Sequence, residues 1–153
     1  MATPEARLEE LGLGVPEVAK PVAAYVPAVR TGNFVYTSGQ LPLRAGQLIA
    51  TGKVGAEVSP DLAVECAQQC ALNALAAIKS VIGDLSRVER VVKVVAFVAS
   101  TPDFTGQPGV ANGASELMGK VFGNSGQHAR SAVGVAVLPL DAPVEVELIA
   151  EVS

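Results

Sequence analysis

Residues 88–99, VERVVKVVAFVA, constrain the fold of this chain most strongly. They are β-branched and almost continuously apolar, a pattern typical of a strand in the interior of a sheet. Because a sheet has two faces, the rest of the chain or a partner must supply apolar cover for this strand.

Two long helices are predicted, one before and one after the central strand in the sequence. The first begins after Ser59, which offers a hydroxyl cap, followed by a proline and an acid; it spans residues 60–82 and ends at Gly83. The second spans about 109–122, begins after Pro108, and repeats its apolar residues on a single face. Polar residues of the first helix form one narrow stripe, so we expect most of its girth to be covered by a sheet.

The other elements are shorter. In chain order they are a helix at 5–12, a linker at 13–21, strands at 22–30 and 34–40 about a turn at 31–33, a loop at 43–55 that includes a short strand at 47–50, and a last strand at 144–152. Pro27 lacks a backbone donor, which indicates an edge or irregular first strand. The order ββαβαββ predicts an α+β fold with two helices on one face of a mixed β-sheet, in a single domain of residues 1–153 with residues 1–20 as an N-terminal extension.

Composition indicates an oligomer. Hydrophobic residues make up 50% of the chain and charged residues 17%, and the mean hydropathy is +0.41. The sheet face without helices is therefore expected to be buried against partner subunits. The net charge is −4 and no run of lysine or arginine occurs, which argues against a nucleic-acid backbone as partner.

The sequence gives little support for a membrane-spanning segment, a signal peptide or a metal site. No uncharged apolar run reaches about 18 residues, and the N-terminus lacks the basic and apolar regions of a signal peptide. Cys66 and Cys70 lie four residues apart on one helix face, and His128 is the single histidine. We expect small buried thiols in a cytoplasmic protein, with no metal or cofactor.

Arg130 is the strongest candidate for a binding residue. It opens the stretch QHARSAVGVAVLP, residues 127–139, in which strand alternation separates a small-residue face from a valine face. The two faces are Arg130, Ala132, Gly134 and Ala136 against Ser131, Val133, Val135 and Val137. We expect the valine face to enter the core. The small residues beside Arg130 leave room for a ligand or for the backbone of a second subunit, and a carboxylate is the anion that suits this guanidinium best. The alternative is a structural pair with Glu145 or Glu147.

Several motifs resemble those of the RidA/YjgF family, also called the L-PSP endoribonucleases. They are QHARSAVGVAVLP followed by VEVELIA, and upstream Ala24-Tyr25-Val26, Gly32-Asn33, Thr37-Ser38-Gly39-Gln40, Asp103-Phe104 and Asn112. The resemblance covers about residues 20–152, and the N-terminal extension points to a sub-branch of the family. It departs from the common pattern at Ala132, where many members have cysteine, at His128, where proline is usual, and at Ala23-Ala24, where glycine-proline is usual.

The resemblance implies a chorismate-mutase-like fold and a homotrimer with sites between subunits. It also implies hydrolysis of reactive enamines and imines, such as 2-aminoacrylate, to 2-keto acids and ammonia. By the resemblance, Arg130 binds the substrate carboxylate, Tyr25 places the substrate, and Glu145 orients or activates water. Ser38 and Gly39 form the pocket floor, and Asn112 stands at the position of the family's asparagine and is counted among the substrate-binding residues.

His128 is a further candidate for substrate binding or acid–base chemistry, because it titrates near neutrality and stands two residues before Arg130. The alternative is a turn or interface histidine. For the whole protein, one alternative function is a non-catalytic trimer that binds small carboxylates or acts as a chaperone. Endoribonuclease activity is disfavoured by the pI of about 5.0 and the lack of a basic patch.

Overall fold

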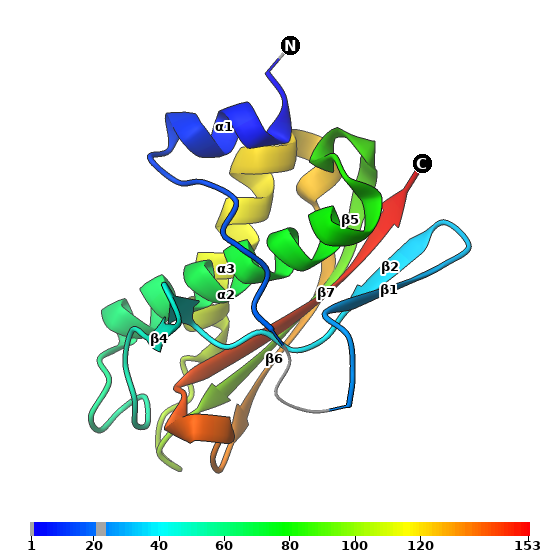
Figure 1. Cartoon of the computed structure of the whole chain (residues 1–153). Helices are drawn as coiled ribbons and strands as arrows, with labels where there is room; N and C mark the ends of the chain where they lie inside the picture. The colour runs from blue at the N-terminus through cyan, green and yellow to red at the C-terminus, as the bar shows by residue number, and fades with distance from the viewer. Residues whose placement is uncertain (1, 21–23) are drawn as a thin grey trace.

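The computed structural model describes residues 2–20 and 24–153. The elements are α1 (Pro4–Glu10), β1 (Ala28–Thr31), β2 (Phe34–Thr37), β3 (Leu43–Arg44), β4 (Gln47–Leu48), α2 (Pro60–Ile82), β5 (Val88–Ala99), α3 (Gln107–Phe122), β6 (Ala129–Val135) and β7 (Val144–Val152). Five strands form one sheet in the order β1-β2-β7-β5-β6, and β3 pairs with β4 in a separate hairpin. Helices α2 and α3 lie together on one face of the sheet (Figure 1). The predicted α+β class and mixed sheet are confirmed.

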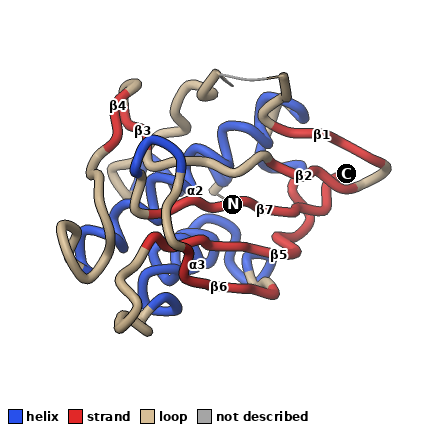
Figure 2. The backbone as a smooth tube through the Cα atoms, turned by 90° about the horizontal axis from the view of Figure 1, so that it is seen from below, coloured by secondary structure: helices blue, strands red, loops and turns tan. Residues whose placement is uncertain are grey.

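The mixed character of the sheet comes from β5. This strand pairs antiparallel with β7 and parallel with β6. Parallel neighbours need a long crossover connection, and α3 supplies it. Figure 2 shows the five strands side by side with the two long helices behind them. Strand β6 therefore lies at one edge of the sheet and β1 at the other.

Local chemistry sets the ends of the long helices, as predicted. The Ser59 hydroxyl accepts a hydrogen bond from the Leu62 amide at 3.2 Å, and Pro60 occupies the first turn of α2. Helix α2 ends at Gly83 with φ 85°, a conformation that glycine adopts without steric cost. Helix α3 begins at Gln107, slightly earlier than predicted, with proline in its first turn.

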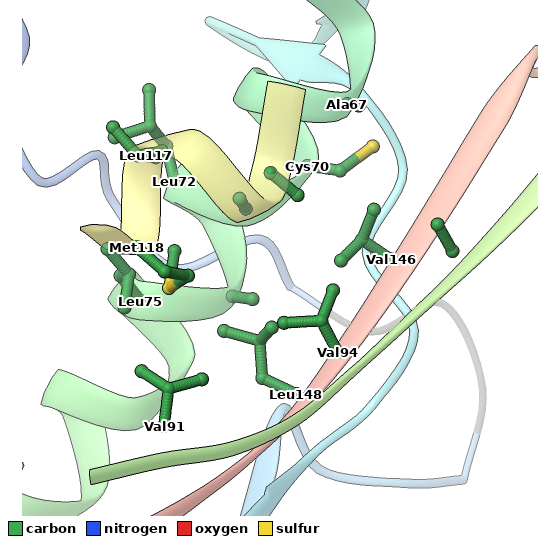
Figure 3. Packing of buried hydrophobic residues seen from close by; sticks show 14 of the residues in the cluster. Ala67, Cys70, Leu72, Leu75, Val91, Val94, Leu117, Met118, Val146 and Leu148 are labelled. Atoms are coloured by element: carbon green, nitrogen blue, oxygen red, sulfur yellow. The ribbon is translucent and has the colours of Figure 1, made fainter. Parts of the chain in front are cut away.

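The core lies between the sheet and the two helices (Figure 3). Val94, Val146 and Leu148 point from β5 and β7 toward Leu75 of α2 and Met118 of α3, and all five are at most 2% exposed. Full burial of an apolar side chain of this size contributes roughly 1.5–3 kcal/mol. Cys66 and Cys70 are also buried, and both thiols are free, as predicted.

The predicted faces of β6 are wrong. Ala132 packs against the core, whereas Val133 is 44% exposed, and Val137, which was predicted to continue the strand but lies beyond its end, is 66% exposed. The reason is the register, because Ala132 pairs with Ala96 of β5, which is fully buried on the helix side of the sheet. Arg130 is two residues before Ala132 in the same strand, so its side chain lies on the same face, the helix side of the sheet.

The opposite face of the sheet carries exposed apolar side chains. Tyr36 pairs with Ile149, and Phe97 pairs with Val133, so these residues form two rows across that face. Val29, at the sheet edge, is 53% exposed and Tyr36 is 45% exposed. Among the described residues, no helix covers this face of the sheet (Figures 1 and 2).

The first two strands are shorter than predicted. Strand β1 begins at Ala28, and residues 21–23 of the predicted strand lie outside the described residues. Pro27 has no backbone N–H to donate, but its carbonyl accepts a hydrogen bond from the Ser38 amide at 2.8 Å. Strand β2 ends at Thr37, and Gln40 returns to the sheet through a single bridge to Val146.

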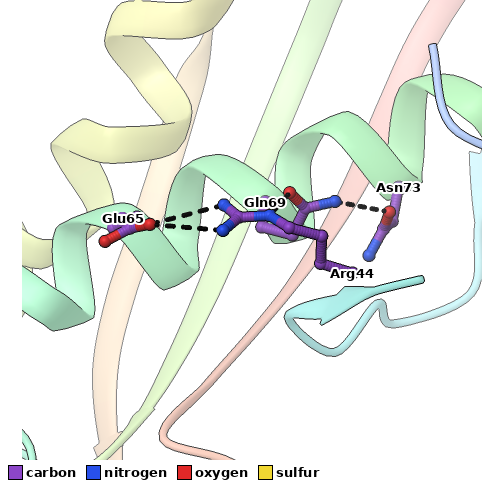
Figure 4. A network of polar contacts seen from close by, with 4 residues as sticks. All are labelled: Arg44, Glu65, Gln69 and Asn73. Carbon is purple, nitrogen blue, oxygen red and sulfur yellow. Dashed lines mark hydrogen bonds and ion pairs between the residues drawn. The ribbon is translucent and has the colours of Figure 1, made fainter. Parts of the chain in front are cut away.

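The polar stripe of α2 is partly buried, which differs from the pattern expected for a solvent-facing stripe. Gln69 and Asn73 are 6% and 3% exposed, because the β3–β4 hairpin lies over them. Asn73 donates to the Leu41 and Leu43 carbonyls at 3.0 Å each and accepts from Gln69 at 3.1 Å. Arg44 continues this network to Gln69 at 3.3 Å (Figure 4), so the polar groups are satisfied.

The N-terminal helix α1 packs against the end of α3. Leu8 is fully buried, and the Arg7 guanidinium donates to the Val121 carbonyl at 3.0 Å. Glu5 forms an ion pair with Lys79 of α2 at 3.2 Å. None of the helices in the described part of the chain has the length and apolar character to cross a membrane.

Candidate functional site

Arg130 is held from one side by α3. It is the second residue of β6, and its Nη1 atom donates to Asn112 Oδ1 at 2.8 Å and to Ser115 Oγ at 3.2 Å. Asn112 and Ser115 are three residues apart, so they present side chains on the same face of α3. Both hydrogens of Nη1 are therefore in use, while Nε and Nη2 donate to no described residue.

His128 belongs to the same cluster. Its Nε2 atom lies 2.8 Å from Ser115 Oγ, and its Nδ1 atom lies 2.6 Å from the Gly126 carbonyl oxygen. A carbonyl oxygen can only accept, so Nδ1 carries a hydrogen. With this one hydrogen on the ring, Nε2 accepts from the Ser115 hydroxyl, whose oxygen accepts from Arg130.

Arg130 has no carboxylate partner among the described residues. The ion pairs found there are Arg44 with Glu65 and Lys79 with Glu5. The alternative in which Arg130 pairs with Glu145 or Glu147 is wrong for the single chain. Glu145 and Glu147 alternate with buried residues of β7, and so lie on the sheet face opposite Arg130.

A second group of predicted residues gathers near the β1–β2 end of the sheet. Tyr25 and Gly39 line a small cavity of about 90 Å³, together with Leu41 and Leu140. Tyr25 is 51% exposed. The Ser38 hydroxyl donates to the Val26 carbonyl at 2.6 Å, which ties the segment that carries Tyr25 to the end of β2.

Glu145 joins this second group through Gly39. A Cβ atom at residue 39 would overlap the Glu145 carboxylate, so glycine lets this side chain lie directly against the backbone at residue 39. Burial, and secondly the charge of Glu147, raise the pKa of the Glu145 carboxyl. A carboxyl that holds its proton to higher pH is suited to general acid–base work.

The predicted site residues thus form two groups in one chain. Arg130, Asn112 and His128 lie at the β6 edge on the helix side, and the second group comprises Tyr25, Ser38, Gly39 and Glu145. Strand β5 separates β6 from β7. Ser115 was missed from the sequence, although its spacing from Asn112 could have indicated it.

A larger cavity of about 590 Å³ lies between residues 16–20 and the β3–β4 hairpin. It contains none of the predicted site residues, although it shares Ala19, Lys20 and Leu43 with the small cavity at Tyr25. Within residues 2–20 and 24–153, no three His, Cys, Asp or Glu side chains gather as metal ligands.

Comparison with known proteins places this fold and these motifs in one family. Residues 5–152 match the family model described as "YjgF/chorismate_mutase-like, putative endoribonuclease". The chain is 44% identical over 149 residues to Protein TCP17 of Trypanosoma cruzi, covering 97% of this chain and 93% of that relative. It is 34% identical over 139 residues to a 2-iminobutanoate/2-iminopropanoate deaminase of Dermatophagoides farinae, covering 90% and 92%.

A solved structure agrees with the sequence relatives. The crystal structure of a protein of unknown function from Agrobacterium tumefaciens superposes with a TM-score of 0.92 at 46% identity, and the match covers 99% of this chain and 94% of that one. Both the sequence and the fold therefore agree with the resemblance found in the motifs. The chain belongs to the RidA/YjgF family of chorismate-mutase-like proteins.

Proposed function

We propose that this chain hydrolyses reactive enamines and imines, of the 2-aminoacrylate type, to 2-keto acids and ammonia. The observation that carries the proposal is Arg130, whose guanidinium is held on one side by Asn112 and Ser115 and has no carboxylate partner among the described residues. Its Nε and Nη2 donors form a planar edge that suits a substrate carboxylate. A 34% identical relative is a 2-iminobutanoate/2-iminopropanoate deaminase, which supports this class of substrate.

The active site in this proposal is shared between subunits of a homotrimer. One protomer supplies Arg130 and Asn112 from its β6 edge, and its neighbour supplies Tyr25, Ser38, Gly39 and Glu145. The exposed apolar face of the sheet supports association, since contiguous exposed apolar surface usually marks an interface.

The chemistry needs few groups. An enamine first becomes the imine, by gaining a proton on carbon and losing one from nitrogen. Water then adds to the electrophilic imine carbon, and one of its protons moves to nitrogen. The remaining hydroxyl proton follows to nitrogen as the carbon–nitrogen bond breaks, which leaves ammonia and a carbonyl group. Arg130 holds the substrate carboxylate and so positions the carbon for attack. Glu145, with its raised pKa, orients the water and exchanges the proton, while Tyr25 limits where the substrate lies.

A coupled assay tests the proposal. A serine dehydratase generates 2-aminoacrylate, and the decay of the imine is followed with wild-type protein, with Arg130→Ala and with no addition. Faster decay that disappears in Arg130→Ala is expected. An unchanged decay rate with wild-type protein would overturn the deaminase proposal, and tight binding of small carboxylates without turnover would instead favour the non-catalytic trimer.

A further inference from the structure

The residues around Arg130 form a chain of donors and acceptors that ends on the backbone. Arg130 Nη1 donates to Ser115 Oγ at 3.2 Å, and the Ser115 hydroxyl lies 2.8 Å from His128 Nε2. His128 Nδ1 donates to the Gly126 carbonyl at 2.6 Å. Each donor faces one acceptor along this path, and the hydrogen bonds within such a chain polarise one another.

The last acceptor of this path is rigidly placed. Gly126 is buried and packs so closely on α3 that a Cβ atom there would overlap the Met118 carbonyl oxygen. Its own carbonyl is therefore fixed relative to the helix that carries Ser115 and Asn112. His128 and Ser115 are each partly buried, which limits the freedom of both side chains.

We infer that His128 is a positioning residue that acts through Ser115 to orient the Arg130 guanidinium. The inference rests on the proposed function, because it concerns how the carboxylate-binding arginine is held. With Asn112 and Ser115 on Nη1, the bidentate edge that remains is Nε and Nη2, so the substrate carboxylate binds side-on. His128 in its neutral form, with the hydrogen on Nδ1, keeps Nε2 as the acceptor that orients the Ser115 hydroxyl.

This role accounts for a departure of the chain from the common family pattern. A proline at residue 128 would offer neither ring nitrogen, and it could not link Ser115 to the Gly126 carbonyl. It also gives Ser115 a role in substrate binding that needs no contact with the substrate. Ser115 is the bridge, and without it His128 and Arg130 share no hydrogen-bonded partner among the described residues.

The first test measures binding of 2-oxobutanoate, a stable carboxylate, by calorimetry. Ser115→Ala and His128→Leu each remove one link, and the expected result is a Kd about five- to ten-fold higher, the loss typical of one hydrogen bond near a charged group. Ser115→Thr keeps the hydroxyl and His128→Gln keeps an acceptor near the Nε2 position, so both are expected to bind within about two-fold of wild type. Ser80→Ala is the matched control, because Ser80 is an exposed serine of α2 whose hydroxyl, within the described residues, hydrogen-bonds to the Ala77 carbonyl alone.

Two further readouts separate positioning from a general loss of structure. Imine turnover is expected to show a higher KM with nearly constant kcat in Ser115→Ala and His128→Leu. Nitrogen NMR of the wild-type imidazole is expected to show hydrogen on Nδ1 and none on Nε2. A hydrogen on Nε2, or a Ser115→Ala variant that binds like wild type while Arg130→Ala does not, overturns the inference.

The failure of this inference can be told from failure of the proposed function. Absence of imine turnover in wild type would reject the deaminase activity, whereas the histidine tautomer and the 2-oxobutanoate affinities of the variants would still decide the role of His128 and Ser115.

Discussion

Gly113 lies where α3 packs closely against the backbone of α2, and it offers a sharp test of the packing. A Cβ atom at residue 113 would overlap the Val64 carbonyl oxygen and lie 3.0 Å from its carbonyl carbon and 3.2 Å from Ala67 Cβ. The Val64 atoms belong to the backbone of α2, so they cannot rotate away. Gly113→Ala therefore forces the two helices apart.

The expected magnitude follows from two opposing terms. Overpacking of a close-packed interior costs about 1–3 kcal/mol, and a clash with backbone belongs at the upper end of that range. Replacing glycine by alanine within a helix returns about 0.5–1 kcal/mol. The net loss in the free energy of unfolding is therefore about 2 kcal/mol for Gly113→Ala.

Gly119→Ala is the matched control, because it is the same substitution in the same helix. A Cβ atom at residue 119 would meet no atom within 4 Å, so this variant is expected to gain about 0.5–1 kcal/mol. Urea unfolding followed by circular dichroism, at one fixed protein concentration, measures both variants. If Gly113→Ala proves as stable as Gly119→Ala, the close packing of α2 on α3 described here is incorrect.

Three further predictions concern buried polar groups. The pKa of the Glu145 carboxyl is raised above 4.5, so the folded state binds this proton more tightly than the unfolded state and loses stability as the pH rises from 4.5 through the raised pKa. Over this pH interval Glu145→Gln should become progressively more stable than wild type, as measured by unfolding at a series of pH values. A constant difference in stability would contradict the burial of Glu145. Burial raises the pKa of Cys66 to about 11 and that of Cys70 well above its usual range. Native protein should therefore react slowly with a thiol reagent and denatured protein rapidly. Fast labelling of both cysteines in native protein would contradict their burial. Asn73→Ala removes the side-chain donor from the Leu41 and Leu43 carbonyls and the acceptor from Gln69, although the Leu41 carbonyl keeps its hydrogen bond from the Leu43 amide at 2.8 Å. The variant should lower the free energy of unfolding in urea by about 1–3 kcal/mol, whereas an unchanged value would mean that the network of Figure 4 contributes nothing to stability.

The elements that were predictable from the sequence are those whose signals are local. The cap at Ser59, the stop at Gly83 and the proline that opens α3 each act within one helical turn, and the helices begin and end close to the predicted residues. The central strand at 88–99 was predicted with its observed bounds, because its apolar run needs no partner to be recognised.

The elements that were not predictable depend on contacts far along the chain. Alternation alone separated the two faces of β6, but only the pairing of Ala132 with Ala96 decides which face meets the helices. Gln69 and Asn73 looked like a solvent-facing stripe because the covering β3–β4 hairpin comes from a different part of the chain. The link from Arg130 to His128 through Ser115 likewise joins β6, the loop before it and α3.

The central claim is that imine hydrolysis needs Arg130 of one subunit and Glu145 of its neighbour. Its most direct test mixes unfolded Arg130→Ala and Glu145→Gln chains in equal amounts, refolds them together and measures 2-aminoacrylate decay. Each variant alone is expected to be inactive, and the mixture is expected to recover about one quarter of wild-type activity, since random assembly of a symmetric trimer pairs the two intact groups at about one site in four. A mixture as inactive as its two parents, despite restored assembly, would contradict a site shared between subunits.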